Sequence, residues 1–388
     1  MTTPDWEVVT ETFAKSERPY GGGAFRIRDN EVLSLKLAGP DTRFKPMAEW
    51  KDPDVAEHTE SWMNSSAERL NRSTVSFQRG TWDSGLTRSF QQPGQSAAWW
   101  YSKDWATQYV STGWMDYKIP VPKNGLSPQI TKLWRSQDGG RKWTQLAWPE
   151  DQNIDRLLFL DASRGYAIGW GPHVWRTADG GHSWREVPLP PVAADPRDPR
   201  KTFSAVDLGP DGVLRVAYYV AMLGDVRNAS VVYRLLWDTA QFEKDLVLPE
   251  QTVVALGSTD EPAGHTYSLY ALSRSGPPRN YDDPNDKGRR IGAISTWASY
   301  QKPTVRQMHT FDERFTLGGL SVGKQGVLLV FATDAARDGA PHDMTFFSRD
   351  FGKSWKELDD GIGQGGWFDS QTNTQYALYA YTLKKRSF

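Results

Sequence analysis

Short runs in which apolar and polar residues alternate recur along most of the chain, separated by turns rich in glycine, proline, aspartate and serine. Such alternation predicts β-strands, because successive side chains of a strand point to opposite faces of its sheet. From residue 156 onward the runs fall into groups of four, at 156–160, 165–170, 174–177 and 184–187, at 203–208, 212–220, 230–237 and 242–248, at 252–256, 265–273, 291–299 and 304–311, and at 315–322, 326–333, 344–348 and 355–358. The pattern therefore predicts an all-β protein built from four-stranded groups.

Both ends of the chain follow the pattern less regularly. Runs at 24–28, 31–37 and 74–78 indicate a first group, with a short helix expected within 54–70, and the stretch from 86 to 146 indicates a second. Strands at 366–368 and 375–383 lack an outer neighbour, whereas the run at 6–13 has no group of its own. Pairing the N-terminal run into the last group would remove an exposed sheet edge.

One motif, hydroxyl-x-Asp-x-Gly-x-x-Trp, occurs three times, each time between two short strands. Its residues are Ser136, Asp138, Gly140 and Trp143, then Thr177, Asp179, Gly181 and Trp184, then Ser348, Asp350, Gly352 and Trp355. Aspartate and hydroxyl side chains bond to nearby backbone N–H groups, and glycine adopts a backbone conformation that other residues resist. The tryptophan opens the returning strand, where it can cover the gap between neighbouring sheets. The motif therefore predicts a tight strand–turn–strand connection.

The three copies resemble the Asp-box, or BNR repeat, of β-propellers such as sialidases, sortilin-type receptor domains and photosystem II assembly-factor-like proteins. This resemblance implies a propeller in which the boxes lie on the rim, away from the central axis where ligands bind. Asp138, Asp179 and Asp350 are accordingly expected to be structural. Asp138 and Asp179 are 41 residues apart, one four-stranded blade, and Asp350 follows Asp179 by 171 residues. We expect a single β-propeller over 1–388 with seven blades, or six as the alternative, closed by the N-terminal strand.

Longer segments between the predicted strands are the expected places for binding, because binding residues often lie on loops held by a rigid frame. Insertions are predicted near 40–70, 99–128, 189–202 and 275–290. The candidate partner-binding residues are Trp100, Trp105, Tyr109 and Trp114 in an aromatic segment, and Tyr281, Arg289 and Arg290 in a charged loop. For the aromatic residues the alternative is packing between blades. For the charged loop the alternative is a solvated hairpin.

Composition narrows the class of function. The chain has 18 Trp, 15 Tyr and 16 Phe, a net charge of −1 and no cysteine. A near-neutral chain gives no electrostatic indication of nucleic-acid binding, and the absence of cysteine excludes disulfides, thiolate metal sites and cysteine nucleophiles. No apolar stretch approaches the ~18 residues of a transmembrane helix. A cysteine-free chain favours the periplasm, with the cytoplasm as the alternative, because Met1 to Asp5 show no signal peptide.

Catalytic motifs are sparse. The six histidines are scattered without ligand spacing, so neither a metal nor a cofactor is predicted. Phe25-Arg26-Ile27 begins the carboxylate-binding arginine motif that the resemblance to sialidases implies, but Arg28 stands where that family has proline. No tyrosine–glutamate pair or acid/base aspartate is identified to complete a sialidase site. No catalytic residue is therefore predicted.

The functional expectation is a non-catalytic β-propeller that binds one protein partner and is otherwise a monomer. The resemblance further suggests a periplasmic immunity protein that neutralises a secreted antibacterial effector, for example a phospholipase, by blocking its active site. A sialidase-like glycoside hydrolase is the first alternative. An assembly factor for a membrane complex is the second.

Overall fold

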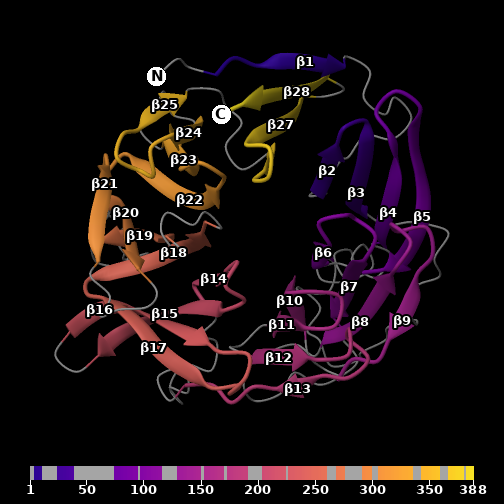
Figure 1. The fold of residues 1–388 in the computed structure, drawn as a ribbon, viewed down its shortest axis with the longest axis horizontal. Helices are drawn as coiled ribbons and strands as arrows, with labels where there is room; N and C mark the ends of the chain where they lie inside the picture. Colours follow the sequence, from indigo (N-terminus) through magenta and orange to yellow (C-terminus); the bar gives the residue numbers. More distant parts are fainter. Residues whose placement is uncertain are drawn as a thin grey trace, which may run out of the picture. The chain divides into compact units, whose positions relative to one another are not determined.

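The computed structural model describes residues 4–10, 24–38, 74–94, 97–115, 129–149, 153–169, 173–190, 203–223, 226–259, 268–275, 291–298, 305–334, 342–358, 366–379 and 382–388. Within these ranges the chain is all-β, without helices, and forms seven sheets of four antiparallel strands (Figure 1). In six of the sheets the strands follow chain order, as in the blades of a β-propeller. Seven blades are thus confirmed over six.

The blades belong to two compact units. Residues 12–187 form the three-blade unit, and residues 1–11 with 188–388 form the four-blade unit.

In each blade of the three-blade unit, the strand that comes first in the sequence is an edge strand of the sheet. The first blade contains β2 (Ala24–Arg28), β3 (Glu31–Ala38), β4 (Thr74–Thr81) and β5 (Gly85–Pro93), the second β6 (Trp99–Tyr101), β7 (Gln108–Met115), β8 (Gln129–Ser136) and β9 (Thr144–Leu146), and the third β10 (Ile154–Phe159), β11 (Gly165–Gly169), β12 (His173–Thr177) and β13 (Arg185–Glu186). The run that begins near residue 86 therefore belongs to the first blade, because a tight turn pairs β5 with β4 from Thr81 and Gly85 onward. The second blade begins at Trp99, so within the predicted insertion at 99–128 residues 99–101 and 108–115 are strands of this blade.

The four-blade unit follows the predicted groups closely. Its blades contain β14 (Ala205–Leu208), β15 (Leu214–Leu223), β16 (Val226–Leu235) and β17 (Phe242–Leu248), then β18 (Gln251–Ser258), β19 (Ser268–Ser275), β20 (Ile291–Ala298) and β21 (Arg306–Phe311), then β22 (Phe315–Val322), β23 (Leu328–Asp334), β24 (His342–Ser348) and β25 (Lys356–Leu358), and finally β26 (Gly366–Asp369), β27 (Thr374–Tyr379), β28 (Thr382–Ser387) and β1 (Glu7–Thr10).

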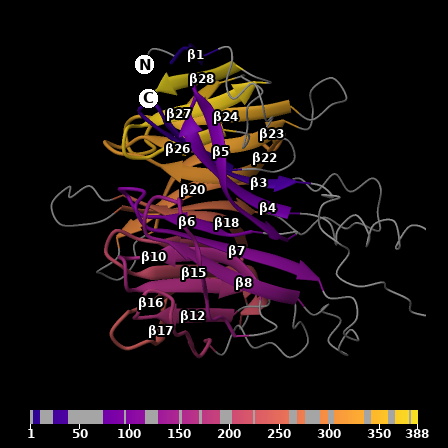
Figure 2. The same ribbon diagram turned by 90° about the vertical axis from the view of Figure 1, so that its right-hand side faces the viewer.

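The last blade combines both ends of the chain. β1 pairs antiparallel with β28 and is the outermost strand, as Figure 2 shows, which confirms that the N-terminal strand completes this blade. The predicted single run at 375–383 is instead two strands, β27 and β28. Arg386 anchors β1, since its guanidinium lies 4.4 Å from the centre of the Trp6 ring and its Nη2 donates to Gln375 Oε1 at 2.6 Å.

The core lies between successive blades of each unit. One apolar cluster joins the first and second blades through Phe77, Phe90 and Val110, and another joins the second and third through Tyr109, Leu133 and Phe159. Because each sheet has apolar side chains on both faces, a blade is stable only when it is covered by its neighbours. The predicted helix within 54–70, the insertion at 40–70 and nearly all of the insertions at 189–202 and 275–290 lie outside the described residues.

Candidate functional site

The three repeats form the same turn, held by the same hydrogen bonds. The first hydroxyl oxygen accepts from the backbone N–H of the second glycine position, at 2.8 Å for Ser136 and Gly140, 2.8 Å for Thr177 and Gly181, and 2.9 Å for Ser348 and Gly352. The indole N–H of the tryptophan donates to the carbonyl of that same glycine, at 3.0 Å for Trp143, 3.1 Å for Trp184 and 3.0 Å for Trp355. The repeats are therefore one local structure used three times.

Each repeat aspartate is occupied within its own turn. Asp138 Oδ1 accepts from the N–H groups of Arg141 and Lys142, both at 2.9 Å. Asp179 accepts from Ser183 Oγ at 2.6 Å, and this hydrogen bond is the main reason that its pKa falls to about 2. These carboxylates therefore stabilise the turn that contains them.

Two of the turns fasten one blade to the blade before it. Arg79 of β4 donates to the carbonyl of Gly139 at 2.7 Å, across the first and second blades. Tyr109 and Arg135 both donate to the carbonyl of Gly180 at 2.9 Å, across the second and third. These two repeat turns thus hold neighbouring blades against each other, which is a structural role.

The candidate partner-binding aromatics lie mostly inside the three-blade unit. Tyr109 is 0% exposed and stacks on Phe159 with ring centres 4.0 Å apart, and Trp105 is 5% exposed. Trp100 is partly buried and packs on Phe159 at 4.9 Å. These three residues therefore have the packing role that was the alternative in the sequence analysis. Trp114 is in β7 but its side chain is not described, and Tyr281, Arg289 and Arg290 lie outside the described residues.

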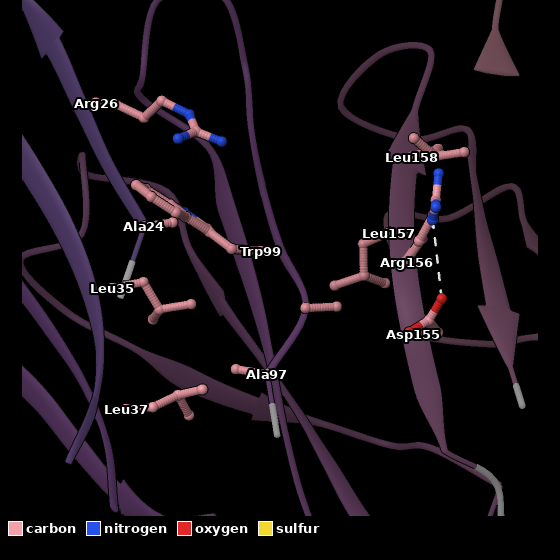
Figure 3. Close-up of a pocket in the computed structure, with 11 residues that line it drawn as sticks. Ala24, Arg26, Leu35, Leu37, Ala97, Trp99, Asp155, Arg156, Leu157 and Leu158 are labelled. Carbon is pink, nitrogen blue, oxygen red and sulfur yellow. Dashed lines mark ion pairs between the residues drawn. The ribbon is translucent and has the colours of Figure 1, made fainter. Parts of the chain in front are cut away.

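A pocket with a volume of ≈ 330 Å³ opens among strands of all three blades of the three-blade unit (Figure 3). β2 and β3 supply one wall, the start of the second blade supplies Ala97, Ala98 and Trp99, and β10 supplies the opposite wall. β2, β6 and β10 are each the first strand of their sheet, so the pocket forms where the first strands of three blades converge. Its size lies at the lower end of the ~300–1,000 Å³ range of ligand pockets.

Arg26 is held firmly on one wall of this pocket. Its Nε donates to Tyr101 Oη at 2.7 Å, and its Nη1 donates to the carbonyl of Phe25 at 2.7 Å. The guanidinium also lies 5.3 Å from the ring centre of Trp99 and 5.4 Å from that of Tyr101, within cation–π range. Aromatic contact and hydrogen bonding together fix the orientation of this cation.

Arg156 and Asp155 lie on the opposite wall, on β10. Their side chains are 51% and 54% exposed and form an ion pair of 3.8 Å. A pair so exposed is worth about 0–1 kcal/mol, because water screens it. Two guanidinium groups and one carboxylate give the lining a formal charge of +1, and Leu35, Leu37, Leu157 and Leu158 give it apolar surface. Such a lining favours an anionic ligand that also has an apolar part.

The sequence predicts only part of this pocket. Arg26 belongs to the Phe25-Arg26-Ile27 motif, and Trp99 belongs to the aromatic segment. Arg156 and the leucines gave no signal, because nothing in the local pattern of a strand shows that its residues will face a strand more than 100 positions away.

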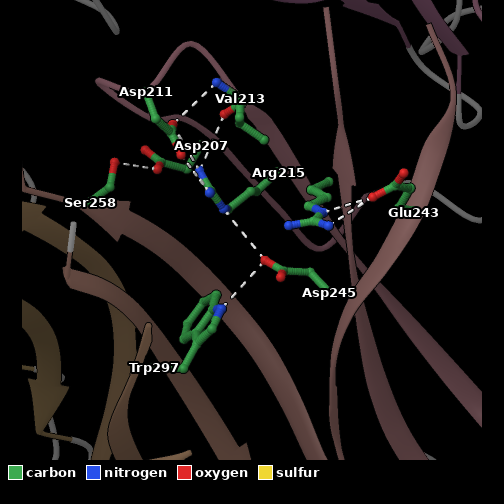
Figure 4. Close-up of polar contacts among 9 residues, drawn as sticks. Asp207, Asp211, Val213, Arg215, Glu243, Asp245, Ser258 and Trp297 are labelled. Carbon is green, nitrogen blue, oxygen red and sulfur yellow. Dashed lines mark hydrogen bonds and ion pairs between the residues drawn. The ribbon is translucent and has the colours of Figure 1, made fainter. Parts of the chain in front are cut away.

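A second polar cluster occurs in the four-blade unit (Figure 4). Arg215, 1% exposed, bonds Asp211 through Nη2 at 2.7 Å and lies 3.5 Å from Asp245. Asp207 accepts from Ser258 Oγ at 2.7 Å, and burial raises the pKa of its carboxyl. The cluster links the blade of β14–β17 to Ser258 of β18 and Trp297 of β20, so it joins two neighbouring blades. The buried guanidinium of Arg215 is thus balanced by the carboxylates of Asp211 and Asp245.

The described residues contain no group of three or more histidine and acidic side chains that could hold a metal ion. Nor does the described part of the chain include a helix that is long and apolar enough to cross a membrane.

Comparisons with known proteins identify the architecture. No family model matches the sequence, and no curated protein matches it. Among solved structures, YCF48 bound to D1 peptide matches with a TM-score of 0.51 and 10% identity over 81% of this chain and 88% of that one. YCF48 from Cyanidioschyzon merolae matches with a TM-score of 0.48 and 11% identity over 81% and 91%. A GH74 xyloglucanase from Xanthomonas campestris matches with a TM-score of 0.47 and 13% identity over 99% of this chain and 53% of that one. With seven four-stranded antiparallel blades, and a fold shared with YCF48 bound to D1 peptide, the chain is a seven-bladed β-propeller.

Proposed function

We propose that this β-propeller binds a protein partner without catalysing a reaction, and that the pocket of the three-blade unit receives a segment of that partner. The observation that carries the proposal is the position of Arg26 and Arg156 on opposite walls of one apolar pocket (Figure 3). Cations beside leucine side chains provide recognition, since charge sets the orientation of a ligand and apolar burial contributes affinity.

Two further features support binding as the function. Propellers hold loops and inner strands on a rigid frame, and the frame here is fastened by the hydrogen bonds of the repeat turns. In addition, YCF48, which shares the fold, was solved in complex with a peptide. A short segment of a partner is therefore a suitable ligand for a pocket of this size.

An effector inhibitor and an assembly factor are both specific forms of protein binding, and both stay predictions, as does the periplasm as their compartment. The identity of the captured partner separates them. A secreted enzyme would indicate an immunity role, and a membrane-complex subunit would indicate an assembly role.

The test is affinity capture from the native cell, with periplasmic and cytoplasmic fractions treated separately. We expect one stoichiometric partner to bind wild-type protein and to be kept by Arg185→Ala. We expect it to be lost from Leu37→Glu, which removes apolar surface and places a carboxylate where the anionic ligand would bind. Arg185 is the matched control because it is exposed on β13, the outermost strand of the same blade as Arg156. A partner retained by both variants would mean that the pocket is not the binding site, and no partner at all would reject the proposal.

Arg26 keeps one enzymatic alternative open, because a sialidase-like hydrolase would use an arginine in this motif to hold its substrate. The check is hydrolysis of a fluorogenic sialoside by wild type and by Arg26→Ala. We expect no turnover by either. Turnover that disappears in Arg26→Ala would establish the enzyme in place of the binder.

A further inference from the structure

We infer that the pocket of the three-blade unit recognises the free carboxyl terminus of its partner, with an apolar side chain on the final residue. This inference rests on the proposed function and specifies its ligand. The last residue of a peptide carries its carboxylate and its side chain on one carbon. A single residue can therefore place an anion beside the arginines and an apolar group beside the leucines of the pocket.

The cationic half of the site is prepared in advance. Arg26 is restrained by its bond to Tyr101 and by two aromatic faces, so binding an anion requires little further ordering of the side chain. Guanidinium groups bind carboxylates through parallel N–H donors, which gives directional as well as electrostatic preference. Arg156 contributes a second cation from the opposite wall.

The carboxylate of Asp155 competes with the carboxylate of the ligand for Arg156. The Asp155 carboxylate lies 3.8 Å from Arg156, and both side chains are about half exposed, at 54% and 51%. An incoming carboxylate replaces a weak, solvated pair rather than a buried one. This arrangement predicts that removing the charge of Asp155 strengthens ligand binding, which is the opposite of the effect of removing Arg26.

The apolar half of the site favours a chain end over an internal acidic residue. Leu35, Leu37 and Leu157 line the pocket together with alanines, and this surface gains most from an apolar side chain. An internal aspartate or glutamate is followed and preceded by further backbone, whose polar groups on both sides need hydrogen-bond partners. A terminal residue has further backbone on one side only. Capture of chain termini is a recurring mode of peptide recognition.

The test uses short fluorescein-labelled peptides that end in leucine, made as the free acid and as the carboxamide, with fluorescence polarisation as the readout. We expect the acid to bind about tenfold or more tightly than the amide, because a charge-assisted contact is at stake. Arg26→Ala and Arg26→Lys should both reduce this preference, since lysine keeps the charge but not the paired donors. Asp155→Asn should tighten acid binding about two- to fivefold, and Arg185→Ala should leave it unchanged.

Thermal melting of each variant establishes that it is folded. Equal binding of acid and amide would overturn the inference, and so would a lack of binding by either peptide. Tight binding of laurate, used as a carboxylate without a peptide, in place of the peptides would assign the pocket to a fatty acid instead. The capture experiment with Leu37→Glu decides the proposed function separately, so a failure of the peptide experiment leaves that result standing.

Discussion

At the scale of single residues, backbone conformation explains why the repeat turns require glycine. Gly140, Gly181 and Gly352 have φ values of 82°, 86° and 83°, a region that side chains resist. The position before each of them is also left-handed, with φ of 72° at Gly139, 69° at Gly180 and 60° at Phe351. The third turn thus holds Phe351 in a conformation that glycine adopts more easily. This turn still forms the same hydrogen bonds from Gly352 and Trp355 as the other two turns form at the matching positions.

Gly181→Ala should lower the free energy of unfolding by about 1–2 kcal/mol, the cost of a left-handed backbone for a residue with Cβ. The new Cβ would also lie 3.1 Å from Leu146 Cδ1. Urea denaturation measures the change, with His182→Ala as the control, because His182 is the exposed neighbour in the same turn. A loss no larger than that of the control would show that the turn tolerates a side chain.

The aspartates around Arg215 should respond to mutation in opposite directions. Burial raises the pKa of Asp207 above its ordinary 3.8. The protonated form is therefore favoured by folding, so this stabilising contribution is full below pH ~4 and is lost as pH rises through the raised pKa. Asp207→Asn should raise the melting temperature at pH 7 and have less effect at pH 4, while its amide can remain bonded to Ser258.

Asp211→Asn is the matched contrast. Asp211 accepts two bonds from the buried guanidinium of Arg215, at 2.7 and 3.2 Å, so loss of its charge should cost about 3 kcal/mol at pH 7. Both variants are compared by thermal melting at the two pH values. Destabilisation of similar size by both substitutions at pH 7 would contradict the assignment of a raised pKa to Asp207 alone.

At the scale of elements, a strand is fastened to the next blade by a few side chains that lie far apart in the sequence. β7 and β8 carry Tyr109 and Arg135, whose donors share the carbonyl of Gly180 in the third blade. The same tyrosine ring stacks on Phe159 of β10. Packing and hydrogen bonding therefore act at one point, and they can be separated by mutation.

Tyr109→Phe should cost only about 1 kcal/mol, because Arg135 still satisfies the carbonyl of Gly180. Tyr109→Ala should cost about 3–5 kcal/mol, as expected for removal of a fully buried aromatic ring. Chemical denaturation of both variants gives the comparison. Equal losses would mean that the hydroxyl rather than the ring carries the contact between these blades.

At the scale of the whole molecule, the last blade depends on a strand from the opposite end of the chain. β1 covers the edge of β28, and Trp6 packs on the guanidinium of Arg386. Without β1 the backbone groups of β28 would form an unpaired edge, which tends to associate with other chains.

Deletion of residues 1–10 should therefore lower the melting temperature and increase self-association, measured by differential scanning calorimetry and light scattering. Trp6→Ala, which keeps the strand but removes the ring, should lower stability without causing association. An unchanged melting temperature after the deletion would show that β1 contributes little to the last blade.

Local pattern was sufficient for the class of fold. Turn chemistry depends on residues within one repeat, so the three motifs could be interpreted without knowledge of distant contacts, and the groups of four strands followed from alternation. Boundaries were less well determined. The pattern predicts the run at 86 as the start of the second blade and 375–383 as one strand, whereas the structure has β5 in the first blade and two strands, β27 and β28. A hairpin turn between two similar strands changes the pattern little, so the pattern alone does not locate these boundaries.

Alternation and turn motifs predicted an all-β propeller, its three structural turns and the return of the N-terminal strand to the last blade. They left six blades as the alternative to seven, and the sheet topology shows seven. The packing of the blades, by contrast, sets which aromatics are buried and which side chains meet. Tyr109 became a core residue, and Arg26 and Arg156 came to line one pocket, because β2 and β10 are brought together by blade packing. Alternation specifies two faces of every strand but not the neighbour that each face will meet.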